Sequence, residues 1–387
     1  MQRRSSQIAT LPNFYGLVSG DERYQTFPSR GAGAVATDIS HHEVMTQEPL
    51  KIGLLAPPWA AVPPPGYGGT ESVVCGLAQG LTAAGHEVVL FATGDSTAPV
   101  PIVYAMASAN WDRIGHGEVE LPHVMRGYEA LAGCDIIHDH TLLGPAWALA
   151  TGYDRVVTTC HGPFSGELRA IYRGYGKRLP VVAISHDQAS HAPEIAVERV
   201  IHHGLDPGEY PQGGGDGDYL LFLGRMTPDK GVREAVLAAR AAGAPLIIAA
   251  KNREPAERAY FTEEIEPLLT DDIEVRGEVT GDAKLGLLGA AKALLNPIQW
   301  AEPFGLVMIE AMACGTPVIA CPNGAAPEIV DAGRTGFLCS DSADLVRAIH
   351  RVQELERAAC RAAVIQRFST ARMIDDHLAL YREMVAR

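Results

Sequence analysis

"AEPFGLVMIEAMACGTPVIA", residues 301–320, places two carboxylates in an otherwise apolar stretch. Burial of a lone carboxylate is costly, so each acid is expected to have a partner or to face a cleft. Pro303 biases the residue before it toward extended backbone, which puts Glu302 in a loop. A helix is predicted over about 304–314, ended by Gly315, and a strand then begins. This loop, helix and strand order indicates an α/β fold.

The start of the predicted helix is a favourable place for an anion. The free amides of Phe304, Gly305 and Leu306 lie at a helix N-terminus, and Gly305 lets a ligand approach the backbone closely. Glu302 precedes this end and Glu310 lies about two turns inside the helix. A carboxylate accepts hydrogen bonds from the vicinal hydroxyls of a sugar or a ribose. A plain helix cap with a solvated Glu310 explains the same segment, which taken alone does not decide.

A second motif, "FLGRMTPDKGVREA" at 222–235, carries two cations. Arg225 comes just past a predicted strand and Lys230 stands at the start of the next helix. Arginine binds phosphate as a fork and lysine binds it as a point charge, so the pair can neutralise a diphosphate. An ordinary basic surface loop is the alternative. Together with the anion-facing helix in the same half of the chain, the motif favours a nucleoside diphosphate.

Composition limits the class of protein. The chain has 387 residues, 47% of them hydrophobic, and a formal charge of −14. This length predicts two domains, and the charge argues against a nucleic-acid partner and allows at most peripheral membrane contact. Seven cysteines without a C-x-x-C pair fit a reducing, cytoplasmic location. We find no apolar run of membrane-spanning length and no secretory signal pattern.

Short apolar strands alternate with helical stretches from Lys51 onward. This alternation predicts βαβ units and parallel sheets covered on both faces. The pattern pauses at "DPGEYPQGGGDGD" (206–218), which reads as a linker, and then restarts. Two doubly wound domains would therefore face one cleft at the carboxyl ends of their strands. The expected strands cover 51–56, 87–92, 135–140, 155–160, 181–185, 219–224, 245–250, 273–277, 293–297 and 317–321.

The glycine-rich turn "PPPGYGGTESVV" (63–74) invites a dinucleotide-binding interpretation. The spacing fails, because Glu71 stands where the last glycine of that fingerprint belongs. Gly68 and Gly69 instead offer amides near the cleft, although a simple tight turn is the competing explanation. A nicotinamide dehydrogenase is accordingly disfavoured.

Histidines near strand ends form the remaining candidates. His161, in "TTCHGPFSGE" (158–167), can bond a substrate hydroxyl or stabilise the charge of an intermediate, and a buried structural histidine is the alternative. His138 and His140 share one face of a strand and suggest metal, but no third ligand has matching spacing. We therefore expect them, and likewise His202 and His203, to line the cleft as polar residues.

Three segments together give a resemblance to a known family: "GRMTPDKG", "AEPFGLVMIEAMACGTPVIA" and "NGAAPEIVDAGRTGFL". They resemble the family 4 retaining glycosyltransferases, which have the GT-B fold of two Rossmann-like domains around a central cleft. The likeness extends over roughly residues 50–385. The E-x7-E segment followed by E-A-M-A-C-G-T-P-V is highly specific for this family, whereas the glycine turn alone is not.

The resemblance implies a role for each candidate residue. Arg225 and Lys230 would hold the donor diphosphate with the amides at Phe304, Gly305 and Leu306, while Glu310 would bind the ribose. The catalytic pair would be His161 and Glu302, both contacting the donor sugar. Gly68 and Gly69 would approach the donor phosphate, and Val279 would hold the base through its backbone. No cofactor or metal is expected. The partners are a nucleotide-diphosphate sugar, expected to be UDP-linked, and an acceptor such as a lipid, a polysaccharide, a pterin or an antibiotic.

The resemblance also implies a domain layout. Residues 1–48 would be a disordered N-terminal extension, with Met45 as an alternative start. An acceptor-side domain would cover 49–207, a linker 208–218 and a nucleotide-sugar domain 219–368, and a last helix over 369–387 would pack back on the first domain. Two other functions stay open: a sugar-nucleotide epimerase or phosphorylase, and a binding protein without turnover. The segment "NPIQWAEPFG" departs from many relatives, so Trp300 is expected to reshape the sugar pocket.

Overall fold

The computed structural model describes residues 48–387 and contains two parallel β-sheets. Met45 and nearly all of the extension predicted over 1–48 lie outside the described residues. For the described part we call residues 48–205 together with the last helix the N-terminal lobe, and residues 206–368 the C-terminal lobe. The predicted fold class, two doubly wound α/β units, is confirmed.

The N-terminal lobe is built on a seven-stranded sheet in the order β3-β2-β1-β4-β5-β6-β7, with every pair parallel. Its strands are β1 Lys51–Leu55, β2 Glu87–Ala92, β3 Ile102–Tyr104, β4 Ile136–Asp139, β5 Val156–Thr159, β6 Val181–Ala183 and β7 Val197–Val200. The connecting helices are α1 Gly69–Ala83, α2 Gly117–Leu131, α3 Gly144–Thr151, α4 Gly166–Tyr175 and α5 His186–Ser190.

The C-terminal lobe is built on a six-stranded sheet in the order β10-β9-β8-β11-β12-β13, again parallel throughout. Its strands are β8 Leu220–Arg225, β9 Leu246–Lys251, β10 Ile273–Val275, β11 Ala293–Asn296, β12 Val318–Ala320 and β13 Gly336–Leu338. The helices are α6 Val232–Ala242, α7 Pro255–Tyr260, α8 Gly281–Ala290, α9 Leu306–Ala313, α10 Ala326–Ile329, α11 Ser342–Arg351 and α12 Arg357–Arg367.

All ten predicted strands are present, and three further strands were missed. The missed strands, β3, β7 and β13, all lie at the edge of a sheet. An edge strand has one neighbour and is partly exposed, so it needs no continuous apolar run; β7, for example, has the sequence VERV.

Helices bury both faces of each sheet, as doubly wound folds require. In the N-terminal lobe, α1 packs on one face through residues such as Leu77 and Leu81, while α2 packs on the other through Tyr128. In the C-terminal lobe, α9 and α12 share one core cluster and α6 and α11 share another. The helices therefore hold the strands in fixed register, and the strand ends carry the polar residues described below.

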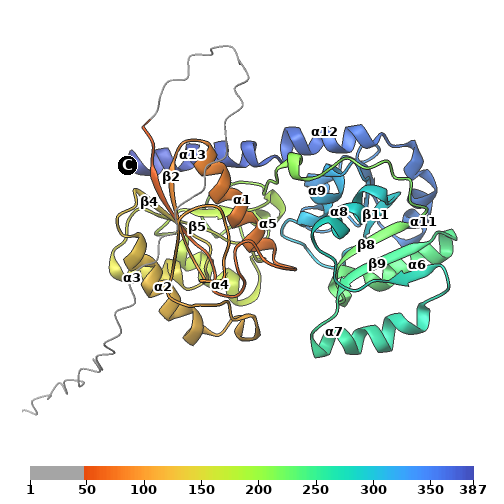
Figure 1. Cartoon of the computed structure of the whole chain (residues 1–387), viewed down its shortest axis with the longest axis horizontal. Helices are drawn as coiled ribbons and strands as arrows, with labels where there is room; N and C mark the ends of the chain where they lie inside the picture. Colours follow the sequence, from red (N-terminus) through yellow and green to blue (C-terminus); the bar gives the residue numbers. More distant parts are fainter. Residues whose placement is uncertain (1–47) are drawn as a thin grey trace, which may run out of the picture. The chain divides into compact units, whose positions relative to one another are not determined.

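The last helix, α13 Thr370–Val385, returns to the N-terminal lobe (Figure 1). Its apolar face, including Met373, Leu380 and Tyr381, joins the core cluster of α1 and the first sheet. The chain thus crosses between lobes twice, and the crossings are paired: the Leu205 amide donates to the Phe368 carbonyl at 3.0 Å. These paired crossings couple the two lobes beside the cleft.

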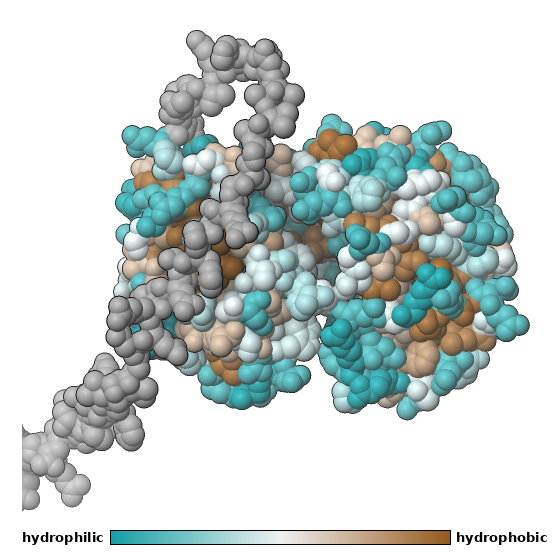
Figure 2. Space-filling model, in the orientation of Figure 1, coloured by the Kyte–Doolittle hydropathy of each residue, from teal (hydrophilic) through white to brown (hydrophobic). Residues whose placement is uncertain are grey.

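The surface in Figure 2 carries polar residues over much of its area, with apolar residues gathered in separate patches between them. Among residues 48–387 we find no helix with both the length and the apolar character needed to span a bilayer.

Gly231 gives a sharp test of how the C-terminal lobe is built. Its φ of +76° belongs to the left-handed region, and an added Cβ would collide with the Pro297 carbonyl oxygen. Gly231→Ala should therefore lower the free energy of unfolding by about 3 kcal/mol, from backbone strain plus overpacking. Gly243→Ala is the matched control, because φ is +61° there and the space is open. That control should lose only about 1 kcal/mol. Urea unfolding measures both; equal losses would contradict the collision.

Candidate active site

A cavity of about 580 Å³ opens at the carboxyl ends of strands from both sheets. Its lining includes Pro57 and His161, which follow β1 and β5. It also includes Gly224, Lys251 and Asn296, which lie at or near the ends of β8, β9 and β11. Ligands of open α/β sheets bind at this edge because helix N-termini and loop amides converge there. The cavity is therefore the candidate active site.

Ten of the eleven predicted site residues line this cavity, and Arg225 is the exception. The ten are Gly68, Gly69, His161, Lys230, Val279, Glu302, Phe304, Gly305, Leu306 and Glu310. Arg225, the last residue of β8, contacts Asp229 at 3.4 Å instead. The structure thus brings together residues from 68 to 310, and it places Arg225 beside the cavity rather than in its lining.

Lys230 and Glu302 form an ion pair in the cavity wall. Their side chains are only 12% and 15% exposed. Trp300 donates its indole N–H to the same Glu302 oxygen at 3.0 Å, and Lys230 Nζ lies 5.3 Å from the centre of the Trp300 ring. Two donors therefore already hold Glu302, and an anionic ligand would give Lys230 a second partner. Trp300 itself is not among the lining residues, and it meets this corner of the pocket only through Glu302 and Lys230.

The tip of α9 points amides into the same space. The helix begins at Leu306, two residues later than predicted, because Gly305 adopts a left-handed φ of +91°. Among the described residues, the amides of Phe304, Gly305, Leu306 and Val307 have no hydrogen-bond acceptor. A helix N-terminus with free amides is a ready anion site, so Val307 adds an amide that the sequence analysis did not assign.

Glu310 lies deeper along α9 and is paired with a lysine that we did not predict. Lys284 Nζ, from α8, is 2.6 Å from Glu310 Oε1, and both residues line the cavity. Tyr210 lines the same region, and burial followed by the charge of Glu310 raises the pKa of its hydroxyl. Tyr210 therefore remains a neutral donor beside the Glu310 carboxylate.

His161 reaches the cavity from the end of β5. Its Nε2 lies 2.9 Å from His140 Nδ1, and burial lowers the pKa of His161 to about 4. At neutral pH its ring is uncharged, so it can hydrogen-bond a hydroxyl but brings no positive charge. The metal hypothesis for His138 and His140 finds no support, because both nitrogens of His138 are already bonded, to Tyr381 and Thr159.

Two segments of the chain match known protein families. Residues 67–209 match the family described as "Glycosyltransferase Family 4", and residues 217–354 match "Glycosyl transferases group 1". A glycogen synthase from Mycobacterium tuberculosis is 28% identical over 360 residues, covering 78% of this chain and 86% of the relative.

Two solved structures share the fold. AviGT4, a glycosyltransferase involved in avilamycin A biosynthesis, is 27% identical with a TM-score of 0.65, over 87% of this chain and 98% of that one. Anabaena Alr3699/HepE in complex with UDP-glucose is 20% identical with a TM-score of 0.69, over 86% and 100%. The chain is a family 4 glycosyltransferase.

In this glycosyltransferase the lobes also touch through residues that sequence reasoning missed. Lys251, 3% exposed at the end of β9, pairs with Glu254 at 2.6 Å, and its Nζ lies 5.2 Å from the centre of the Trp111 ring in the other lobe. Glu278 accepts the Tyr67 amide at 2.8 Å, again across the lobes. Lys251 had one available signal: it is a charge at the end of the apolar strand "PLIIAA".

Glu71 is the other residue missed in the glycosyltransferase pocket. It lies in the first turn of α1, lines the cavity and is only 5% exposed. Burial raises the pKa of its carboxyl from the ordinary 4.5 to about 7. Perturbed carboxyls in clefts are common at functional sites, so Glu71 adds a titratable group to the pocket.

The Glu71→Gln variant should change the pH dependence of stability. The pKa of Glu71 is about 7 in the folded state and 4.5 when the chain is unfolded. Between pH 4.5 and 7, the folded state therefore binds more protons at Glu71 than the unfolded state does. Stability is therefore lost as pH rises from 4.5 toward 7, by an amount on the order of 3 kcal/mol. Glutamine removes this loss, so the variant should gain on wild type at about pH 8 but not at about pH 4.

Urea unfolding of both proteins at the two pH values measures the difference. Asp139, whose pKa burial also raises to about 7, is present in both proteins and cancels. A pH-independent difference between the two would contradict the burial of Glu71 as an ionisable group.

Proposed function

We propose that this glycosyltransferase moves a sugar from a UDP-linked donor to a hydroxyl of its acceptor with retention of anomeric configuration, without a metal. The observation that carries the proposal is the convergence of Lys230, the free amides at the tip of α9 and Glu310 on one cavity. The charge of Lys230 and the amides at the helix end suit the phosphates of a nucleoside diphosphate, and the Glu310 carboxylate suits its ribose hydroxyls.

The chemistry would follow from the charge on the leaving group. Cleavage of the bond between sugar and diphosphate leaves negative charge on the phosphate, which Lys230 and the amides of Leu306 and Val307 would stabilise. The acceptor hydroxyl would attack from the same face through an oxocarbenium-like state and give its proton to the departing phosphate oxygen. Glu302, held by Lys230 and Trp300, would bind the donor sugar instead of forming a covalent intermediate.

Other lining residues would complete the donor site. The neutral ring of His161 would bond a sugar hydroxyl, Gly68 and Gly69 would face the phosphates, and the backbone at Val279 would hold the base. Arg225 would enter only by leaving Asp229. For the base we favour uracil, which is part of the UDP-glucose held by Alr3699/HepE, a protein of the same fold.

The relatives suggest the chemical class of the acceptor. One is a glycogen synthase and another takes part in the biosynthesis of avilamycin A. We propose a carbohydrate or a small molecule with a free hydroxyl, with a lipid headgroup as a further option. A cytoplasmic location is proposed from the cysteines, because all seven lie in the described residues as free thiols.

A donor panel tests the proposal. UDP-, GDP- and ADP-linked sugars would be scored by thermal shift and by slow hydrolysis, since a correct donor stabilises the folded state by mass action. We expect the UDP sugars to give the largest shift, and proton NMR of the first transfer product should show the anomeric configuration of the donor. An inverted product would overturn retention. An isomerised donor or a free sugar phosphate, formed without acceptor, would favour an epimerase or a phosphorylase instead.

A further inference from the structure

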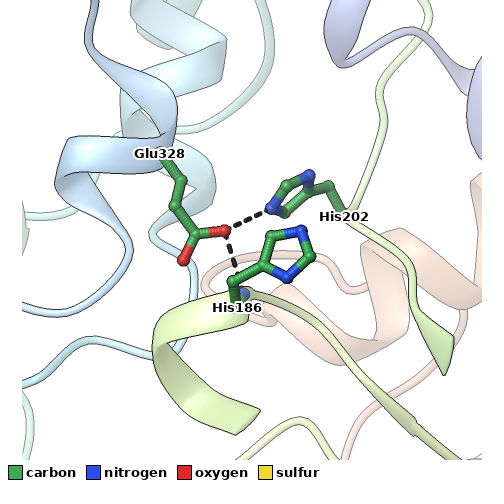
Figure 3. A group of neighbouring side chains, drawn as sticks. All are labelled: His186, His202 and Glu328. Atoms are coloured by element: carbon green, nitrogen blue, oxygen red, sulfur yellow. Dashed lines mark hydrogen bonds and ion pairs between the residues drawn. The ribbon is translucent and has the colours of Figure 1, made fainter. Parts of the chain in front are cut away.

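Three side chains of the types that bind metal ions meet between the lobes, outside the cavity described above. His186 opens α5, His202 follows β7, and Glu328 lies in α10 of the C-terminal lobe. One ligand atom from each lies within 4.8 Å of the other two, and the three side chains turn toward one another (Figure 3). Two histidines 16 positions apart and a glutamate more than 100 positions further along the sequence thus form one compact cluster.

Glu328 is held in place by three hydrogen-bond donors of the N-terminal lobe. Its Oε2 accepts a hydrogen bond from His202 Nε2 at 2.6 Å and from the His186 amide at 2.9 Å, and its Oε1 accepts the Asp187 amide at 2.6 Å. These contacts occupy both carboxylate oxygens from the N-terminal lobe. A charged carboxylate, oriented by backbone amides, therefore faces two imidazole rings.

His186 supplies the open side of the cluster. Its residue is exposed to solvent, and within the described residues its ring has no hydrogen-bond partner. Within the described residues, no protein group therefore competes with a metal ion for the ring nitrogens of His186. The ring of His202 lies 5.7 Å from that of His186, centre to centre.

We propose that His186, His202 and Glu328 bind one divalent transition-metal ion of the zinc class, which joins the two lobes. Two imidazole nitrogens and one carboxylate oxygen are a recognised donor set for this ion, with water in the fourth position. The ion takes the place of the proton between His202 Nε2 and Glu328 Oε2, and His202 then carries its proton on Nδ1. The Asp187 amide keeps the carboxylate oriented from outside, as a second-shell donor does.

This site is separate from the donor cavity. None of the three residues of the site lines that cavity. His202 lies next to the cavity wall, because the centre of its ring is 5.9 Å from the centre of the Phe304 ring. The proposed transfer reaction does not use the ion. Its effect is to fix two N-terminal-lobe histidines to a C-terminal-lobe carboxylate, which stabilises the folded chain by mass action.

The experiment uses Co²⁺ as a visible probe and Zn²⁺ as its competitor. Titration of the full chain with Co²⁺ should give visible d–d absorption that saturates at one equivalent and is abolished by Zn²⁺. Saturating Zn²⁺ should also raise Tm by roughly 3 °C or more. His186→Ala, which removes an exposed ring without a partner, should fold normally and bind Co²⁺ at least about tenfold more weakly. Glu328→Gln should do the same.

Two controls locate the effect. His350→Ala removes an exposed histidine on α11, and His41→Ala/His42→Ala removes the adjacent histidine pair that precedes the described residues. Both should keep the one-equivalent signal. Absence of a saturable Co²⁺ spectrum, or a spectrum that survives His186→Ala unchanged, overturns the proposal. A spectrum lost only in the His41/His42 variant overturns it as well.

Discussion

Lys230→Ala should lower kcat for sugar transfer by about 100- to 1000-fold, the range seen when one electrostatic donor to a developing oxyanion is removed. The ammonium group is nearly buried beside Glu302, and we expect it to stabilise the leaving group together with the amide dipoles of α9. Without it, charge on the departing phosphate would build up next to an unneutralised Glu302. Steady-state kinetics with a UDP sugar measures the loss.

Two variants control for this result. Lys292→Ala removes an exposed lysine that pairs with Asp218 away from the cavity and should keep wild-type kcat. Lys230→Arg keeps the charge on a longer, planar group and should recover only part of the activity. A kcat of Lys230→Ala within about threefold of wild type would refute the role of Lys230, because removal of a true oxyanion donor costs far more than that.

The second large effect is expected at Glu310. Glu310→Ala should lower kcat/KM for the donor by about 100-fold, because hydrogen bonds to a charged acceptor are worth roughly 1.5–3 kcal/mol each. The substitution also leaves Lys284, its partner at 2.6 Å, without a carboxylate. Lys284→Ala separates loss of the ion pair from loss of the ribose contact. It removes the ion pair with Glu310 but keeps the Glu310 carboxylate that accepts from the ribose hydroxyls.

A modified donor makes the test specific to the ribose. A 2′-deoxyribose UDP sugar should react more slowly than the ordinary donor with wild type, but at nearly the same rate as the ordinary donor with Glu310→Ala. If the deoxy penalty persists in Glu310→Ala, the ribose is bound elsewhere.

The fold was accessible from sequence because its inner strands are continuous apolar runs. Strands such as β8 and β9 are covered on both faces, so their sequences carry the pattern with little interruption. Edge strands such as β7 and β13 have one neighbour and carry a weaker pattern. The start of α9 was placed too early because the left-handed turn at Gly305 replaces a turn of helix, and periodicity does not detect that difference.

The site was accessible where its residues follow strand ends. Lys230 and His161 were found in this way, because parallel strands present their carboxyl ends at one edge. Lys284 and Trp111 were missed, since their part in the cavity depends on how α8 and the opposite lobe pack. Arg225 shows the converse: its position next to a strand end was correct, but a near carboxylate, Asp229, draws its side chain aside.

Lys230 and the tip of α9 are proposed to bind the diphosphate of the donor in the C-terminal lobe. Calorimetric titration of wild type and Lys230→Ala with UDP and with uridine tests this proposed role most directly. We expect the variant to bind UDP about 10- to 100-fold more weakly, as loss of a charged hydrogen bond implies, while uridine binding is unchanged. Equal affinity of both proteins for UDP would contradict it.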